Sequence, residues 1–132
     1  MLRLEGVEGG YGQGRVLFGM DLAAEAGQVV SLIGRNGMGK TTTVRTIMGL
    51  MRPSAGAISF EGRPITRLAP NAIARLGLGL VPEGRRVFPS LTVEENLVAT
   101  ARPGPWTLAR VAGLFPRLGE RRRQSARTLS GG

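Results

Sequence analysis

The sequence is short of several reactive side chains, and each shortage removes a class of function. Its 132 residues include no cysteine, which excludes a disulfide framework and a thiolate metal site. No apolar run approaches the roughly 18 residues needed to cross a bilayer. The N-terminal stretch MLRLEGVEGG has no charged segment followed by an apolar core, as a signal peptide would. We therefore expect a soluble, cytoplasmic protein of one domain.

The charged residues are also unevenly divided among the residue types. Histidine is absent, aspartate occurs only at Asp21, and the 18 basic residues include a single lysine, Lys40. The net charge of +9 is compatible with nucleic acid or an anionic membrane face as a partner. However, the arginines are scattered, and no aromatic residue lies within their one dense cluster, Arg121–Arg123. A nucleic-acid stacking platform requires such aromatic residues, so we expect no nucleic-acid partner.

The first part of the chain has the pattern of a mixed α/β structure. Leu2–Val7 and Val16–Leu22 are predicted as strands separated by the glycine-rich turn Gly9–Gly12. Gln28–Ile33 is a nearly continuous apolar run, which predicts a strand buried on both faces of a parallel sheet. After it, apolar residues recur with helical spacing, and Gly49 and Pro53 are expected to end that helix. The apolar positions of this helix are Val44, Ile47, Met48 and Met51.

Three further elements are predicted before residue 82. Ala57–Phe60 and Arg63–Thr66 form a hairpin, in which Pro64 confines the second arm to a sheet edge. Pro70–Leu76 is a short helix opened by proline. Gly79–Val81 is a short strand, because proline follows it directly.

The pattern changes between residues 82 and 92, and the second part is predicted to be helical. Thr92–Glu95 fits a capping box, in which the threonine hydroxyl and the last glutamate satisfy free amides of a first helical turn. That helix should end before Arg102. A second helix is predicted over about Thr107–Phe115, because its apolar residues share one face. We therefore divide the chain into residues 1–81 and residues 82–132.

The most specific motif is the P-loop Gly34–Thr41, which matches G-x-x-x-x-G-K-[ST] at every position. Its glycines let backbone amides approach phosphate oxygens, and the following helix contributes its N-terminal dipole. Lys40 supplies a compact cation for the β- and γ-phosphates, and the Thr41 hydroxyl is suited to Mg²⁺. A predicted strand precedes the motif and a predicted amphipathic helix follows it, which is the context that supports this reading of the motif. The motif predicts ATP and Mg²⁺ as cofactors and leaves kinases, GTPases, motor ATPases and other P-loop proteins open.

The C-terminal end narrows this choice. Leu129–Gly132 reads LSGG, the beginning of the LSGGQ signature of ATP-binding-cassette (ABC) ATPases, and it follows the P-loop by about ninety residues. The stretches Gly34–Leu50, Val81–Pro89 and Leu114–Gln124 resemble the branch of this family that powers branched-chain amino acid importers. The resemblance implies the α/β P-loop NTPase fold of an ABC ATPase. Residues 1–81 would hold the antiparallel β-subdomain and P-loop, and residues 82–132 the Q-loop and helical subdomain.

The resemblance also implies roles for residues outside the P-loop. Tyr11 would stack on adenine with Val16 beside it, although either could instead be a core or strand-edge residue. Glu83 occupies the Q-loop position, where most of the family has glutamine, and would reach Mg²⁺, the alternative being an exposed turn glutamate. Ser130–Gly132 would contact the γ-phosphate held by a partner subunit. The predicted nucleotide contacts are Tyr11, Val16, Gly34, Arg35, Asn36, Gly37, Met38, Gly39, Lys40, Thr41, Thr42, Ser130, Gly131 and Gly132.

Phosphoryl transfer needs a second hold on Mg²⁺ and a group that orients water. In the family an apolar strand ending in Asp-Glu and a later histidine do this, and no segment of the 132 residues matches either. We therefore predict no catalytic residue, an incomplete sheet and a truncated ATPase that is inactive alone. The expected partners are a second ABC ATPase subunit and membrane permease subunits, at the inner face of the cell membrane. The alternatives are a non-transport ABC ATPase and a non-enzymatic nucleotide-binding module.

Overall fold

The computed structural model describes residues 1–12, 14–84 and 86–129. The chain divides into two compact units, Met1–Leu80 and Val81–Gly132, and each is described by itself. Across the described residues, no helix has both the length and the apolar character needed to cross a bilayer.

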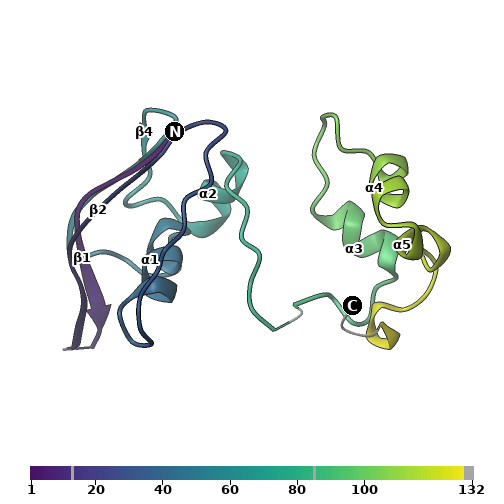
Figure 1. Ribbon diagram of the computed structural model, residues 1–132, viewed down its shortest axis with the longest axis horizontal. Helices are drawn as coiled ribbons and strands as arrows, with labels where there is room; N and C mark the ends of the chain where they lie inside the picture. The colour runs from purple at the N-terminus through teal and green to yellow at the C-terminus, as the bar shows by residue number, and fades with distance from the viewer. Residues whose placement is uncertain (13, 85, 130–132) are drawn as a thin grey trace. The chain divides into compact units, whose positions relative to one another are not determined.

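An antiparallel four-stranded sheet forms the body of the first unit, in the order β2-β1-β3-β4. Its strands are β1 (Leu2–Tyr11), β2 (Gly14–Ala24), β3 (Ala55–Phe60) and β4 (Arg63–Pro64). The helices α1 (Lys40–Ile47) and α2 (Pro70–Arg75) lie on the same side of this sheet (Figure 1). The core of this unit consists of aliphatic side chains from the strands, from the residue after β4 and from α2: Leu4, Val7, Leu17, Ile58, Ile65 and Ile73.

A bulge in β1 allows two unevenly spaced residues to share the core. Leu4 and Val7 are three positions apart, so regular strand alternation would place them on opposite faces. The pairing of β1 with β2 shifts register between them, and both side chains are buried. The Asp21 carboxylate accepts a hydrogen bond from the Gly6 amide at 2.6 Å inside this bulge. The aspartate predicted only to lie on an early strand thus supports the sheet irregularity.

Most predicted elements of the first unit are present, with longer strands at its beginning. Strands cover both Leu2–Val7 and Val16–Leu22, and Tyr11 pairs with Gly14. The predicted turn at Gly9–Gly12 is therefore wrong for its first three residues, because β1 continues to Tyr11 and the chain reverses only after it. The hairpin at Glu61-Gly62, the edge position of Pro64 and the proline-opened helix α2 are confirmed.

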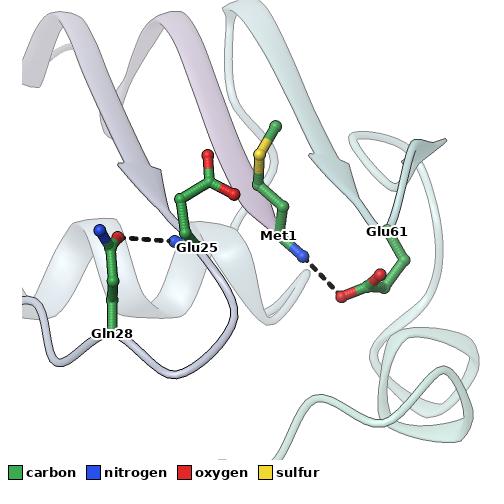
Figure 2. A network of polar contacts seen from close by, with 4 residues as sticks. All are labelled: Met1, Glu25, Gln28 and Glu61. Carbon is green, nitrogen blue, oxygen red and sulfur yellow. Dashed lines mark hydrogen bonds and ion pairs between the residues drawn. The ribbon is translucent and has the colours of Figure 1, made fainter.

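The prediction of a buried strand at Gln28–Ile33 is wrong for this structure. Residues 28–34 are in no strand, and Val29 and Ile33 are 96% and 94% exposed. The Gln28 side-chain oxygen accepts from the Glu25 amide at 2.8 Å, and the Gln28 amide donates to the Glu25 carbonyl, forming a turn (Figure 2). Without a neighbouring strand in the described part of the chain, an apolar run has no ladder partner and cannot be buried. The prediction of a short strand at Gly79–Val81 is also wrong, because these residues are in no strand.

Helix α1 buries threonines more completely than the apolar residues predicted for its inner face. Thr43 and Thr46 are 1% and 2% exposed, whereas Val44 and Ile47 are half-buried. The hydroxyls of the two threonines donate to the carbonyls one turn earlier, at Gly39 and Thr42. Their polar atoms are thereby satisfied inside the helix, so the methyl groups can pack inward without a desolvation penalty.

The second unit is built from short helices joined by backbone hydrogen bonds. They are α3 (Val93–Ala99), α4 (Leu108–Leu114), α5 (Pro116–Glu120) and a 3₁₀ turn at Ala126–Thr128. The predicted capping box is confirmed, since Thr92 accepts from the Glu95 amide and Glu95 accepts from the Thr92 amide. Among the described residues of this unit, only Val93 and Ala126 are buried hydrophobic side chains. Polar caps and backbone bonds therefore contribute much of its order.

We predict that Gly56→Ala destabilises the first unit strongly. A Cβ atom at Gly56, whose φ is +86°, would lie 2.4 Å from the Gly6 carbonyl oxygen across the strand pair. Left-handed strain and the clash together should cost about 3 kcal/mol. Urea denaturation followed by far-UV circular dichroism measures the change. The matched control is Gly79→Ala, which meets no atom within 4 Å and should stay within about 0.5 kcal/mol of wild type. Equal effects of the two substitutions would contradict the bulge geometry.

The capping box predicts a pH dependence for the second unit. Hydrogen bonds from the backbone and side chain of Thr92 lower the pKa of Glu95 below its ordinary value of 4.5. The stabilisation is therefore present above the pKa of the unfolded state and is lost as the pH falls through the lower folded pKa. Trp106, the single tryptophan, reports unfolding of this unit by fluorescence. Glu95→Gln should remove the loss of stability that sets in as the pH falls below the ordinary pKa of 4.5, while keeping the cap at pH 7. An unchanged pH profile would rule out this role.

Candidate functional site

The P-loop begins after the turn at Gln28 and leads directly into α1. Residues 33–38 are exposed, and the loop is closed locally by the Met38 amide, which donates to the Arg35 carbonyl at 3.3 Å. Gly39 forms the N-cap of α1 with φ 89° and ψ 2°. The eight-residue helix therefore points its unpaired N-terminal amides toward the exposed loop, an arrangement that favours anions.

Lys40 is held across this loop by its own backbone. Its ammonium donates to the Gly34 carbonyl at 2.6 Å and to the Arg35 carbonyl at 2.8 Å. Since both acceptors belong to the beginning of the P-loop and the lysine to its end, the ammonium bridges the loop's two sides. A cation at that place adds to the positive end of the helix dipole.

Gly39 is the position where the loop meets the sheet. A Cβ atom there would lie 2.9 Å from Leu17 Cδ2 and 3.3 Å from the Val16 carbonyl oxygen. No other residue combines this close approach with a φ of 89° at low cost. The structure thus brings Val16, predicted from resemblance alone, beside the P-loop. Leu17 was not among the predicted site residues, although its position in a strand that precedes the P-loop could have indicated this contact.

Tyr11 lies at the end of β1 and is 51% exposed. Its hydroxyl accepts a hydrogen bond from Arg45 of α1 at 3.4 Å. A hydrogen bond with the Thr42 side chain, and to a smaller extent one with Arg45, lowers the pKa of the Tyr11 phenol below 10.0. The Tyr11 hydroxyl is therefore linked to the P-loop helix, while about half of the side chain remains exposed. Sequence reasoning missed Arg45, which lies five residues after the P-loop lysine.

Of the remaining predicted site residues, some lie in the described part of the chain and others lie outside it. Thr41 is exposed on the first turn of α1, whereas Thr42 is buried at 6% exposure. Glu83 is exposed in the second unit, where its carbonyl accepts from Arg86 at 3.4 Å. Ser130, Gly131 and Gly132 lie outside the described residues. Among those described, no cluster of three or more acidic residues could hold a metal by itself.

Comparison with known proteins identifies the family. The family model described as "ABC transporter" matches residues 17–132. The chain belongs to the ABC transporter family. It is 41% identical, over its whole length, to the high-affinity branched-chain amino acid transport ATP-binding protein BraG of Pseudomonas aeruginosa, and it covers 59% of that protein. It is 36% identical, again over its whole length, to the Nod factor export ATP-binding protein I of Cupriavidus metallidurans, covering 45% of it. The ABC chain therefore spans about half of each relative.

Solved ABC structures confirm the fold. The chain superposes on an ATP-binding subunit of an ABC transporter with a TM-score of 0.83 and 32% identity, over 98% of this chain and 55% of that one. The predicted α/β P-loop NTPase fold with an incomplete sheet is thereby confirmed. The family resemblance drawn from the P-loop and LSGG is confirmed as well.

We predict that Tyr11 titrates below 10.0 in the folded chain. It is the only tyrosine, so absorbance at the phenolate band reports it without interference from another tyrosine. Replacing the partner Thr42 by valine, or Arg45 by glutamine, should move the midpoint upward toward the ordinary value. Arg52→Gln is the matched control for a lost surface charge and should leave the midpoint in place. An equal shift in Arg45→Gln and Arg52→Gln would show a general charge effect instead.

Proposed function

We propose that this ABC chain binds Mg-ATP and provides nucleotide-binding parts of a subunit that drives a membrane permease. The observation that carries the proposal is the P-loop itself. One ammonium and the free amides of α1 converge on an exposed loop whose packing against β2 requires glycine. The convergence of these groups favours a polyphosphate over a single carboxylate, because several anionic oxygens can be bound at once.

We propose separate contacts with the phosphates and with the base of the nucleotide. The ammonium of Lys40 would exchange its two carbonyl partners for β- and γ-phosphate oxygens, which are stronger acceptors because they are charged. Gly34–Thr42 would surround the phosphates, and Tyr11 and Val16 would flank the adenine. The exposed ring of Tyr11 and its link to Arg45 support a base-binding position close to the loop.

Magnesium is proposed to bind beside the phosphates. Thr41 is exposed on the first turn of α1, and a hydroxyl oxygen suits a hard cation. Glu83 is the proposed second contact, reached through its carboxylate or a metal-bound water. The complete coordination shell of Mg²⁺ would also include phosphate oxygens and water molecules, because Mg²⁺ usually retains several waters.

The assembly and its activity are proposed from the family. Residues 1–81 would serve as the nucleotide-binding subdomain and residues 82–132 as the Q-loop and helical subdomain. A second ATPase subunit would supply the opposing signature motif, and Ser130–Gly132 would play that part toward the partner. The exposed side chains of Val87 and Phe88 are proposed to lie near a permease at the inner face of the membrane. ATP hydrolysis is proposed for the complete cassette, and residues 1–132 alone are proposed to be inactive.

Branched-chain amino acids are the proposed transported solutes. The chain is 41% identical to the branched-chain amino acid relative and 36% to the Nod factor relative, with its whole length aligned to each. Glutamate at the Q-loop position, Glu83, also resembles the branched-chain branch. Import is therefore favoured over export.

We predict that Lys40→Met weakens ATP binding at least tenfold, because it removes the only ammonium at the loop. The measurement is titration of the purified chain with a fluorescent ATP analogue in the presence of Mg²⁺. Arg63→Met is the matched control, since it removes an exposed cation from β4, at the opposite edge of the sheet from β2, and should change the affinity less than threefold. If Lys40→Met bound the analogue as wild type does, nucleotide binding at this loop would be wrong.

A further inference from the structure

A cavity in the second unit has walls of mixed chemistry that the proposed nucleotide site does not use. It is open to solvent, measures about 350 Å³ and lies among α3, α4 and α5. This volume is at the small end of the range for ligand pockets, about 300–1,000 Å³. Its walls are mostly aliphatic, and it has one acidic and one basic residue: Glu94, Leu97, Leu108, Ala109, Ala112, Leu118, Gly119 and Arg122.

The aliphatic wall follows from helical spacing on two helices. Glu94 and Leu97 are three residues apart on α3, and Leu108 and Ala112 are four apart on α4, so each pair shares a helix face. Leu118 and Gly119 of α5 complete the wall. A Cβ atom on Gly119 would lie 3.1 Å from Ala112 Cβ, so α4 and α5 are already in close contact. The space is therefore between that helix pair and α3.

The two charged residues are held next to each other by the backbone. The Glu94 amide donates to the Arg122 carbonyl at 2.9 Å, which fixes the start of α3 to the turn after α5. Their side chains form only a loose ion pair, with 4.0 Å between Arg122 Nε and Glu94 Oε2. Both groups are partly exposed, so each keeps hydrogen-bonding capacity for another molecule.

We propose that this cavity binds a free α-amino acid with an aliphatic side chain. The guanidinium of Arg122 would bind the carboxylate in its two-pronged geometry, and Glu94 would bind the ammonium. The aliphatic side chain would lie among Leu97, Leu108 and Leu118. An acid and a base about 4 Å apart beside an apolar wall match such a zwitterion better than they match a singly charged or neutral ligand.

This site goes beyond the proposed function, because none of its lining residues belongs to the P-loop and it needs no nucleotide. If the transporter carries branched-chain amino acids, the same solute would be sensed inside the cell by its own ATPase. The binding proposal itself rests on the cavity and not on that assignment.

The test is calorimetric titration of the full 132-residue chain with L-leucine in the absence of nucleotide. Binding should be measurable in the millimolar range or tighter, and Arg122→Gln should weaken it at least tenfold. Arg123→Gln is the matched control, because it removes an equal charge from the same arginine cluster but does not line the cavity. It should change the affinity less than twofold. Melting curves for both variants establish that each remains folded.

Ligand analogues test the two charged contacts separately. 4-Methylpentanoate, which lacks the ammonium, and 3-methylbutylamine, which lacks the carboxylate, should each bind at least tenfold more weakly than L-leucine. Equal binding of N-acetyl-leucine methyl ester would show a general apolar groove and overturn the proposal. No binding of L-leucine at 10 mM (roughly the weakest affinity of interest), or equal losses in Arg122→Gln and Arg123→Gln, would also overturn it. Loss of nucleotide binding in Lys40→Met with leucine binding intact would leave this site established independently.

Discussion

The close approach of Gly39 to β2 is the contact on which the arrangement of the candidate site depends. Only a residue without a side chain fits against Leu17 and the Val16 carbonyl while holding a left-handed conformation. That contact places the start of α1 against the sheet, and the ammonium of Lys40 then reaches back to Gly34 and Arg35. The geometry of the candidate site is therefore a consequence of the Gly39 backbone packing against β2.

The second unit is organised by a different kind of interaction. With two buried hydrophobic side chains among its described residues, it has little apolar core. Reciprocal capping by Thr92 and Glu95, and backbone bonds from α3 to the 121–126 segment, fix its short helices instead. Asn96 adds side-chain bonds to the amide and carbonyl of Phe88, which hold the segment before α3. A loosely packed unit of this kind leaves an open cavity between its helices, whereas a dense core would fill it.

Local signals were the reliable part of the prediction. The helix after the P-loop, the capping box, the Glu61-Gly62 hairpin and the proline-opened helix α2 each depend on a few adjacent residues, and all were predicted correctly as structures. The errors concern contacts between distant segments. Gln28–Ile33 has the composition of a buried strand, but a strand also needs a partner, which its own residues do not specify. The bulge that joins Leu4 and Val7 to one core depends on Asp21, fifteen residues beyond Gly6.

The sequence by itself identified the family of this ABC chain, because the P-loop motif and the LSGG stretch are local patterns that occur together in few other proteins. It also determined where helices begin, since caps are local. Only the tertiary structure decided that Val16 and Leu17 contact the loop, that Arg45 reaches Tyr11, and that Glu94 and Arg122 face the same cavity. The residues that contact Gly39, and the pair of Tyr11 and Arg45, are separated by 22 to 34 positions in the sequence. Glu94 and Arg122 are separated by 28 positions. Packing between elements sets such distances, and no spacing rule along the chain encodes them.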